Sequence, residues 1–140
     1  MRTIKILFSV SLLLAVVSCY AQTTNEATKT VSTNKVEAYY FHFNARCITC
    51  RTVEAQAQAD IKLLYPELIK SGNISFTSIN LDEPAGKTIG KDLGISGQTL
   101  LLVKGNKKVN ITNEGFMYAV SQPDKLKAVI KEKIDGLLGK

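Results

Sequence analysis

The sequence predicts an α/β domain with the element order β-α-β-α-β-β-α. Short apolar and aromatic segments alternate with longer segments whose apolar residues recur every three or four positions, as in strands and amphipathic helices. A Cys-x-x-Cys pair, Cys47 and Cys50, lies where the first predicted strand passes into the first predicted helix. A strand followed by C-x-x-C and a helix is typical of a thiol–disulfide redox site.

The first 21 residues have the pattern of a secretory signal. Arg2 and Lys5 precede an apolar run over 6–17 that is too short to span a membrane comfortably. Cleavage after Ala21 would remove 1–21; alternatively, the segment Val16–Cys19 resembles a bacterial lipobox, which would make 1–18 a lipoprotein signal and Cys19 the lipidated residue. We therefore expect export to the bacterial periplasm or cell envelope, where disulfides persist, with membrane contact only through an N-terminal lipid.

Residues 22–35 are rich in Thr, Asn and Ala without an apolar period, which predicts a flexible linker before a domain over 36–140. The apolar and aromatic run Val36–Phe43 predicts a central strand that is covered on both faces. Helical periodicity over Arg46–Lys70 predicts the first helix, with a kink or an early end at Pro66. Ile74–Leu81 predicts a second strand, parallel to the first.

The second half of the domain is predicted to contain a short helix, a hairpin and a long helix. Gly86–Leu93 is the short helix, with Gly94 as its C-cap. Thr99–Val103 is a buried strand, and a Gly-Asn turn at 105–106 leads to a fourth strand over Lys107–Thr112. The last helix starts at Pro123 and carries an apolar stripe of Leu126, Val129, Ile130, Ile134, Leu137 and Leu138.

The formal net charge is +6, but the basic residues are scattered along the chain. Scattered lysines are typical of solvated hairpin and helix faces, and no nucleic-acid recognition motif is present. We expect no nucleic-acid partner and, because no flavin-binding signature is present, no cofactor.

The element order, with the cysteines at the end of the first strand, resembles the thioredoxin fold over 36–140. The strand into Cys47 and Cys50 carries this resemblance, as does Leu93–Val103, where a glycine-containing loop meets the third strand. The resemblance implies a four-stranded mixed sheet with helices on both faces. Within the superfamily, Tyr39–Phe43 with the following Arg46-Cys47-x-x-Cys50 is similar to a small exported bacterial group, the nitrophenyl compound nitroreductase subunit ArsF-type proteins.

Two positions depart from the thioredoxin pattern. Thioredoxins place a cis-proline before the Thr that opens the third strand, whereas Gln98 precedes Thr99 here, and we expect a trans bond. Thioredoxins also carry a buried acid six residues before the first cysteine, where this chain has Phe41. Because that negative charge is missing and Arg46 and Arg51 flank the pair, we expect a stabilised thiolate and a more oxidising disulfide than that of thioredoxin.

These features predict an exported thiol–disulfide oxidoreductase. Cys47 would be the exposed nucleophile and Cys50 the buried resolving cysteine. Ile48 and Thr49 would present an apolar and a hydroxyl contact to the partner. The expected partners are protein thiols or disulfides and an external electron donor or acceptor.

Several alternatives remain open at this stage. Without the cis-proline, Cys47 and Cys50 could bind a soft metal ion such as Cu(I) and deliver it. The chain could also be a thioredoxin-fold subunit of a larger reductase. An inert structural disulfide is a weaker alternative, because so short a loop constrains the unfolded chain little. His42, the only histidine, would be either a base or third metal ligand, or a packed strand residue.

Overall fold

The computed structural model describes residues 34–140, so both forms of the predicted signal, the lipidation candidate Cys19 and nearly all of the predicted linker lie outside the described residues. The described elements are β1 (Val36–His42), α1 (Ile48–Leu64), α2 (Pro66–Lys70), β2 (Ile74–Asn80), α3 (Pro84–Leu93), β3 (Thr99–Lys104), β4 (Lys107–Asn110), α4 (Thr112–Tyr118) and α5 (Pro123–Leu138). None of these helices is long and apolar enough to span a bilayer.

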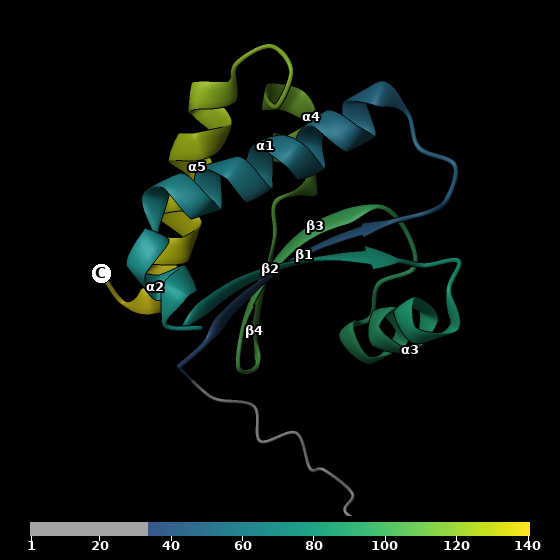
Figure 1. The fold of residues 1–140 in the computed structure, drawn as a ribbon, viewed down its shortest axis with the longest axis horizontal. Coiled ribbons are helices and arrows are strands. Elements are labelled where there is room, and N and C mark those ends of the chain that lie inside the picture. The colour runs from purple at the N-terminus through teal and green to yellow at the C-terminus, as the bar shows by residue number, and fades with distance from the viewer. Residues whose placement is uncertain (1–33) are drawn as a thin grey trace, which may run out of the picture. The chain divides into compact units, whose positions relative to one another are not determined.

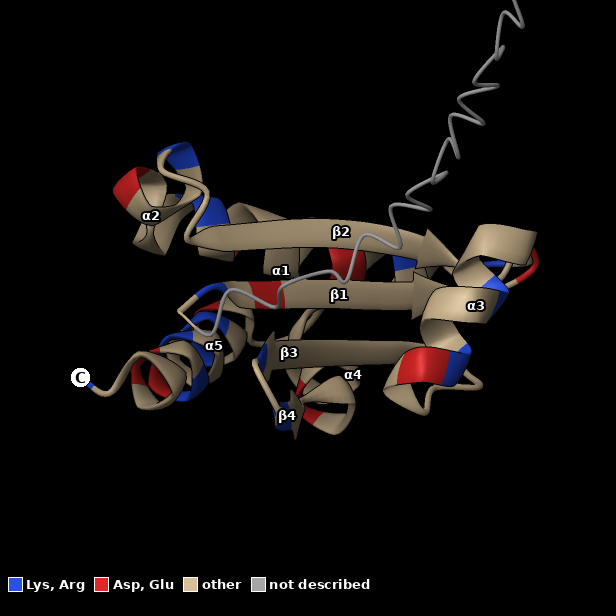
Figure 2. Ribbon diagram, turned by 90° about the horizontal axis from the view of Figure 1, so that it is seen from below, with Lys and Arg blue, Asp and Glu red and all other residues tan. Residues whose placement is uncertain are grey.

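The four strands form one mixed sheet in the order β2-β1-β3-β4 (Figures 1 and 2). β1 pairs with β2 in parallel, whereas β3 is antiparallel to both β1 and β4. The predicted α/β class, the parallel β1–β2 pair and the hairpin of the last two strands are confirmed. This architecture fits the thioredoxin-like fold in general.

Helices cover both faces of the sheet. Figure 1 shows α1, α4 and α5 on one side of it and α3 on the other. Along β1, Val36, Ala38 and Tyr40 belong to the large core under α1 and α5, whereas Tyr39 and Phe41 belong to a smaller core with α3. Because successive strand residues point to opposite faces, coverage of both faces explains why β1 is apolar without alternation.

The first helix differs from the predicted single segment over Arg46–Lys70. α1 begins only at Ile48, because Cys47 has an extended backbone and acts as the N-cap, and it ends at Leu64. α2 then starts with Pro66, which can occupy the first position of a helix because the missing N–H would have no partner there. The predicted end of the helix at this proline is confirmed.

The fourth strand is two residues shorter than the predicted Lys107–Thr112, and the helix that follows it was not predicted. The fourth strand stops at Asn110, and residues 112–118 form the helix α4 instead of extending the strand. The Thr112 hydroxyl accepts a hydrogen bond from the backbone N–H of Leu100 at 2.9 Å, which draws the chain back over the sheet. Gly115 allows a close approach to α1, since a Cβ there would lie 3.0 Å from Cγ1 of Val53. So short a helix with a glycine at its contact gives little periodic signal.

The remaining bounds agree closely with prediction, and Gly94 caps α3 in the left-handed conformation, with φ of 74°. Figure 2 shows acidic and basic residues interspersed along α5 and α3, in keeping with the scattered charges of the sequence.

Candidate functional site

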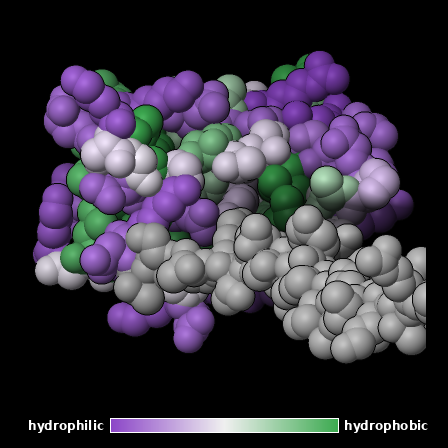
Figure 3. Space-filling view, turned by 60° about the horizontal axis from the view of Figure 1, so that its bottom comes forward, coloured by the Kyte–Doolittle hydropathy of each residue, from purple (hydrophilic) through white to green (hydrophobic). Residues whose placement is uncertain are grey.

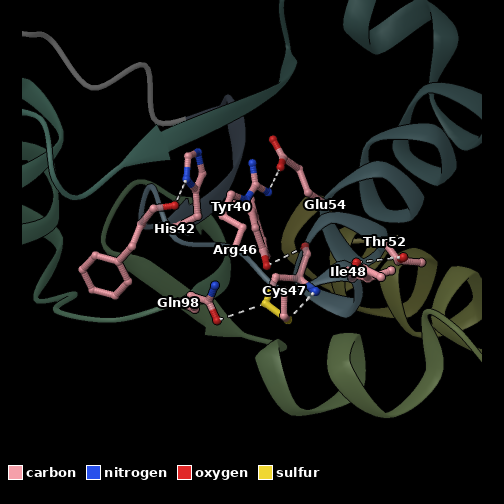
Figure 4. Close-up of polar contacts among 10 residues, drawn as sticks. Tyr40, His42, Arg46, Cys47, Ile48, Thr52, Glu54 and Gln98 are labelled. Carbon is pink, nitrogen blue, oxygen red and sulfur yellow. Dashed lines mark hydrogen bonds and ion pairs between the residues drawn. A yellow bond between two sulfur atoms is a disulfide. The ribbon is translucent and has the colours of Figure 1, made fainter.

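Cys47 and Cys50 form a disulfide at the start of α1, with their Cα atoms 5.1 Å apart (Figure 4). Cys47 is exposed, whereas Cys50, in the first turn of the helix, is only 4% exposed. The buried face of α1 holds Cys50 against the core, and the N-cap position leaves Cys47 outside it. Of the two sulfur atoms, therefore, that of Cys47 is the one a large partner can reach.

The start of α1 also favours negative charge on Cys47. The backbone N–H of Cys50 donates a hydrogen bond to Sγ of Cys47 at 3.0 Å. Backbone N–H groups at a helix start lack intrahelical acceptors, and the helix dipole adds positive potential there. In the reduced protein, the same geometry stabilises a Cys47 thiolate, which is the nucleophilic form of a cysteine.

The surface around Cys47 is partly apolar. Ile48 is 85% exposed, whereas Thr49 is half-buried and Arg51 is exposed. The Ile48 carbonyl accepts a hydrogen bond from the Thr52 hydroxyl at 3.1 Å, which holds the first turn together. An exposed isoleucine directly beside an exposed sulfur gives this surface an apolar contact for a partner.

Gln98 lies against the disulfide from the other side. Its side-chain oxygen is 3.5 Å from Sγ of Cys50, and in the reduced protein it is placed to accept the thiol hydrogen (Figure 4). Thr99 follows as the first residue of β3 and is buried. No cis peptide bond occurs among residues 34–140, so the expectation of a trans bond before Thr99 is confirmed.

Arg46 is paired with an acid, Glu54, that was not among the predicted site residues. Its guanidinium forms an ion pair with the Glu54 carboxylate and lies over the Tyr40 ring, 5.6 Å from the ring centroid. Figure 4 shows the guanidinium directed toward Glu54 and away from the disulfide. Arg46 was expected to favour the thiolate as a flanking positive charge; the structure pairs that charge with Glu54, whereas Arg51 presents an exposed guanidinium at this site.

Glu54 is ionised in this environment. Burial of the carboxyl works to raise its pKa, but polar contact with Ser78 and the hydrogen bond and charge of Arg46 outweigh burial and hold the pKa below its ordinary value. Glu54 follows Cys50 by four residues on α1, a spacing that places two side chains on the same helix face. A negative charge thus lies one helical turn from the buried cysteine.

Tyr40 links β1 to the cysteine turn. Its ring is fully buried, and its hydroxyl donates a hydrogen bond to the Cys50 carbonyl at 2.8 Å. Burial raises the pKa of this hydroxyl, against the opposing charge of Arg46, so it remains a donor at neutral pH. Phe41, at the position of the thioredoxin acid, packs in the smaller core on the opposite face of the sheet.

His42 packs beside Tyr40, with ring centroids 6.3 Å apart, and its Nδ1 lies 3.0 Å from the Phe43 carbonyl oxygen. Figure 4 shows it apart from the sulfur atoms. Among residues 34–140, no group of three or more His, Cys, Asp or Glu side chains could hold a metal ion. The structure thus gives His42 the surroundings of a packed strand residue.

The loop before Cys47 is anchored to the end of β2. The backbone N–H of Asn44 donates to Oδ2 of Asp82 at 2.6 Å, and the side chain of Asn80 donates to Oδ1 of Asn44 at 2.8 Å. These bonds fix the path of the chain between β1 and the cysteines, so the exposed sulfur is held in place before a partner arrives.

No protein-family model and no curated protein matches this sequence. A solved structure described as the structure of a malarial protein is similar in part. It is 19% identical in sequence, covers 71% of this chain and 97% of its own, and has a TM-score of 0.44. Similarity at this level carries no information about function.

Three contributors to the site were not predicted from the sequence: Tyr40, Glu54 and the anchor at Asn44. For Glu54 a signal existed, since its spacing of four from Cys50 places both on one face of a helix. For Tyr40 and Asn44 the contacts join segments distant in sequence, and nothing local indicates them.

Proposed function

We propose that this protein is an exported thiol–disulfide oxidoreductase with a thioredoxin-like domain and a Cys47–Cys50 redox pair. One observation carries the proposal: an exposed sulfur at a helix N-cap is disulfide-bonded to a buried sulfur in the first turn of the same helix. Export is supported by the signal-like pattern of the first 21 residues. The strand order and the position of the cysteines after β1 support the thioredoxin-like assignment.

The reaction is a balanced two-step exchange. The Cys47 thiolate attacks one sulfur of a partner disulfide, forming a mixed disulfide and releasing the other partner sulfur as a thiolate. The Cys50 thiolate then attacks Sγ of Cys47, releasing the second partner sulfur and closing the Cys47–Cys50 disulfide. Two electrons pass to the partner, and the two protons lost by the cysteines end on the partner's thiols. The reverse sequence oxidises a partner dithiol.

The roles of the remaining residues follow from their positions. Arg46 and Tyr40 hold the cysteine turn, Gln98 contacts Cys50, and Ile48 offers an apolar contact next to the reacting sulfur. Thr49 lies between the cysteines, and Thr99 fixes the loop that carries Gln98. In this reaction the electrons pass between sulfur atoms, and none of these side chains takes part in their transfer.

Catalysed reduction of insulin by dithiothreitol tests the proposed reaction. We expect the wild-type protein to accelerate the reaction, the Cys47→Ser variant to lose the acceleration completely, and Thr49→Ser, a matched control between the cysteines, to retain it. The reduced protein should also release added Cu(I) to competing glutathione. Retention of copper without catalysed exchange would instead support a metal-delivery function, and neither activity would indicate a subunit of a larger reductase.

A further inference from the structure

A shallow apolar pocket of about 380 Å³ lies at the end of the sheet where β1 and β2 finish. Phe43, Leu81 and Ile95 supply its apolar wall, and Lys87, Lys91 and Ser96 supply polar groups. Crevices at the carboxyl ends of parallel strands are common ligand sites in α/β folds, because loops rather than strands surround them. In Figure 3, which brings the bottom of the molecule in Figure 1 forward, hydrophobic residues form small patches among polar side chains.

The pocket and the disulfide are bordered by the same two loops. Phe43 starts the loop that leads to Cys47, and Ser96 lies in the loop that leads to Gln98. Gln98 in turn contacts Sγ of Cys50. A polypeptide bound with one of its sulfur atoms at Cys47 can therefore extend over the loop to this pocket.

The pocket has a positive rim. Lys87 and Lys91 lie one turn apart on α3, are exposed, and form no ion pair with any acidic side chain of residues 34–140. The acids that precede α3 are already engaged, Asp82 by a loop N–H and Glu83 by a side-chain amide. Asp92 is exposed on the same helix but does not line the pocket.

We propose that this pocket binds an apolar side chain and a neighbouring acidic residue of the partner protein segment whose disulfide is exchanged at Cys47. The apolar wall removes the partner's side chain from water, and the two lysines attract the carboxylate beside it. Docking of this kind presupposes the exchange reaction proposed at Cys47, and it adds a partner class: segments in which an apolar and an acidic residue flank the reacting cysteine.

Exchange kinetics with matched peptides test the docking. Each short peptide carries one cysteine that is blocked as a methyl disulfide. It also carries one residue pair, either Leu-Glu, Leu-Gln or Ser-Glu. In each of the three series, this pair is placed at successive positions before and after the cysteine. In at least one position, we expect the reduced protein to react about twofold to fivefold faster with the Leu-Glu peptide than with the Leu-Gln peptide, the range expected for surface charge pairs. It should also react faster with the Leu-Glu peptide than with the Ser-Glu peptide, which lacks the apolar side chain.

Charge variants locate the effect. Lys87→Gln with Lys91→Gln should abolish the preference for Glu over Gln while leaving that for Leu over Ser. Lys62→Gln with Lys70→Gln, which removes the same charge from exposed positions elsewhere, should preserve both preferences. An equal rate for all three peptides at every position, or an unchanged Glu preference in the first double variant, would overturn the assignment.

Binding without chemistry separates the docking site from the redox function. Serine analogues of the peptides, added to the oxidised protein, should shift the NMR resonances of the Lys87, Lys91 and Ser96 amides, most strongly for Leu-Glu. If these shifts occur but the protein catalyses no disulfide exchange, the docking site stands and the proposed redox function is refuted. Fast exchange without any shift would refute the docking site alone. Shifts caused by free 4-methylpentanoate at lower concentration than by the peptide would assign the pocket to a small carboxylate and overturn the proposal.

Discussion

The pair of Arg46 and Glu54 is expected to set the charge balance beside the cysteines. Arg46 directly precedes Cys47, and Glu54 lies one helical turn after Cys50. In the wild-type protein the two charges oppose each other. Glu54→Gln leaves the guanidinium unbalanced and should stabilise the Cys47 thiolate, whereas Arg46→Gln leaves the carboxylate unbalanced and should destabilise it.

The size of the effect follows from Coulomb's law. As a general scale, two unit charges about 8 Å apart in surroundings with an effective dielectric constant of about 40 interact by about 1 kcal/mol. For a two-electron couple, 1 kcal/mol corresponds to about 20 mV. Stabilising the thiolate stabilises the reduced form, so the reduction potential should rise by about 20 mV in Glu54→Gln and fall by a similar amount in Arg46→Gln.

Equilibration with glutathione buffers, followed by separation of the reduced and oxidised forms, measures these potentials. The wild-type value is expected above the roughly −270 mV of thioredoxin, the double variant should return close to it, and Glu67→Gln, which removes an exposed charge on α2, should leave it unchanged. A general loosening of the site would move both single variants in the same direction. That result, or shifts under about 5 mV, would refute the electrostatic explanation.

Three further outcomes are expected. Alkylation of the reduced protein near neutral pH should label Cys47 much faster than Cys50, and equal rates would contradict their assigned roles. Gly86→Ala should lower the urea midpoint of unfolding strongly, because a Cβ there would lie 1.8 Å from the carbonyl oxygen that ends β2. Gly136→Ala, which has open space around it on α5, should raise the free energy of unfolding by about 0.5–1 kcal/mol. Similar shifts of the midpoint in both variants would contradict the close packing of α3. Burial raises the pKa of Asp60, so ionising this carboxyl opposes folding. The stability of Asp60→Asn relative to wild type should therefore improve as pH rises from about 3 to 7, and a constant difference would contradict this.

The fold could be predicted largely because its elements have strong local signals. β1 is apolar on both faces, Pro66 and Pro123 begin helices, and Gly94 ends one. α4 could not be predicted in the same way. It depends on the hydrogen bond between Thr112 and a strand residue twelve positions earlier, and on the close approach of its glycine to α1.

The site was predictable in its chemistry but not in its electrostatics. The spacing of Cys47 and Cys50 at a helix start indicates both the disulfide and which sulfur is exposed. Arg46, read along the chain, is an unbalanced charge beside a cysteine, and only the three-dimensional structure shows it turned onto Tyr40 and Glu54. The sequence shows which charged residues are close to the cysteines along the chain. The direction of each side chain, which only the structure gives, determines which neighbouring charge it pairs with.

Trapping the mixed disulfide tests the proposed exchange most directly. The Cys50→Ser variant, incubated with an excess of a disulfide-bonded protein such as insulin, should accumulate one covalent adduct through Cys47, identified by peptide mass spectrometry. Cys47→Ser, treated identically, should form little or none, because its remaining cysteine is buried. Adducts formed equally well through Cys50, or no adduct in either variant, would contradict the assignment of Cys47 as the exchanging nucleophile.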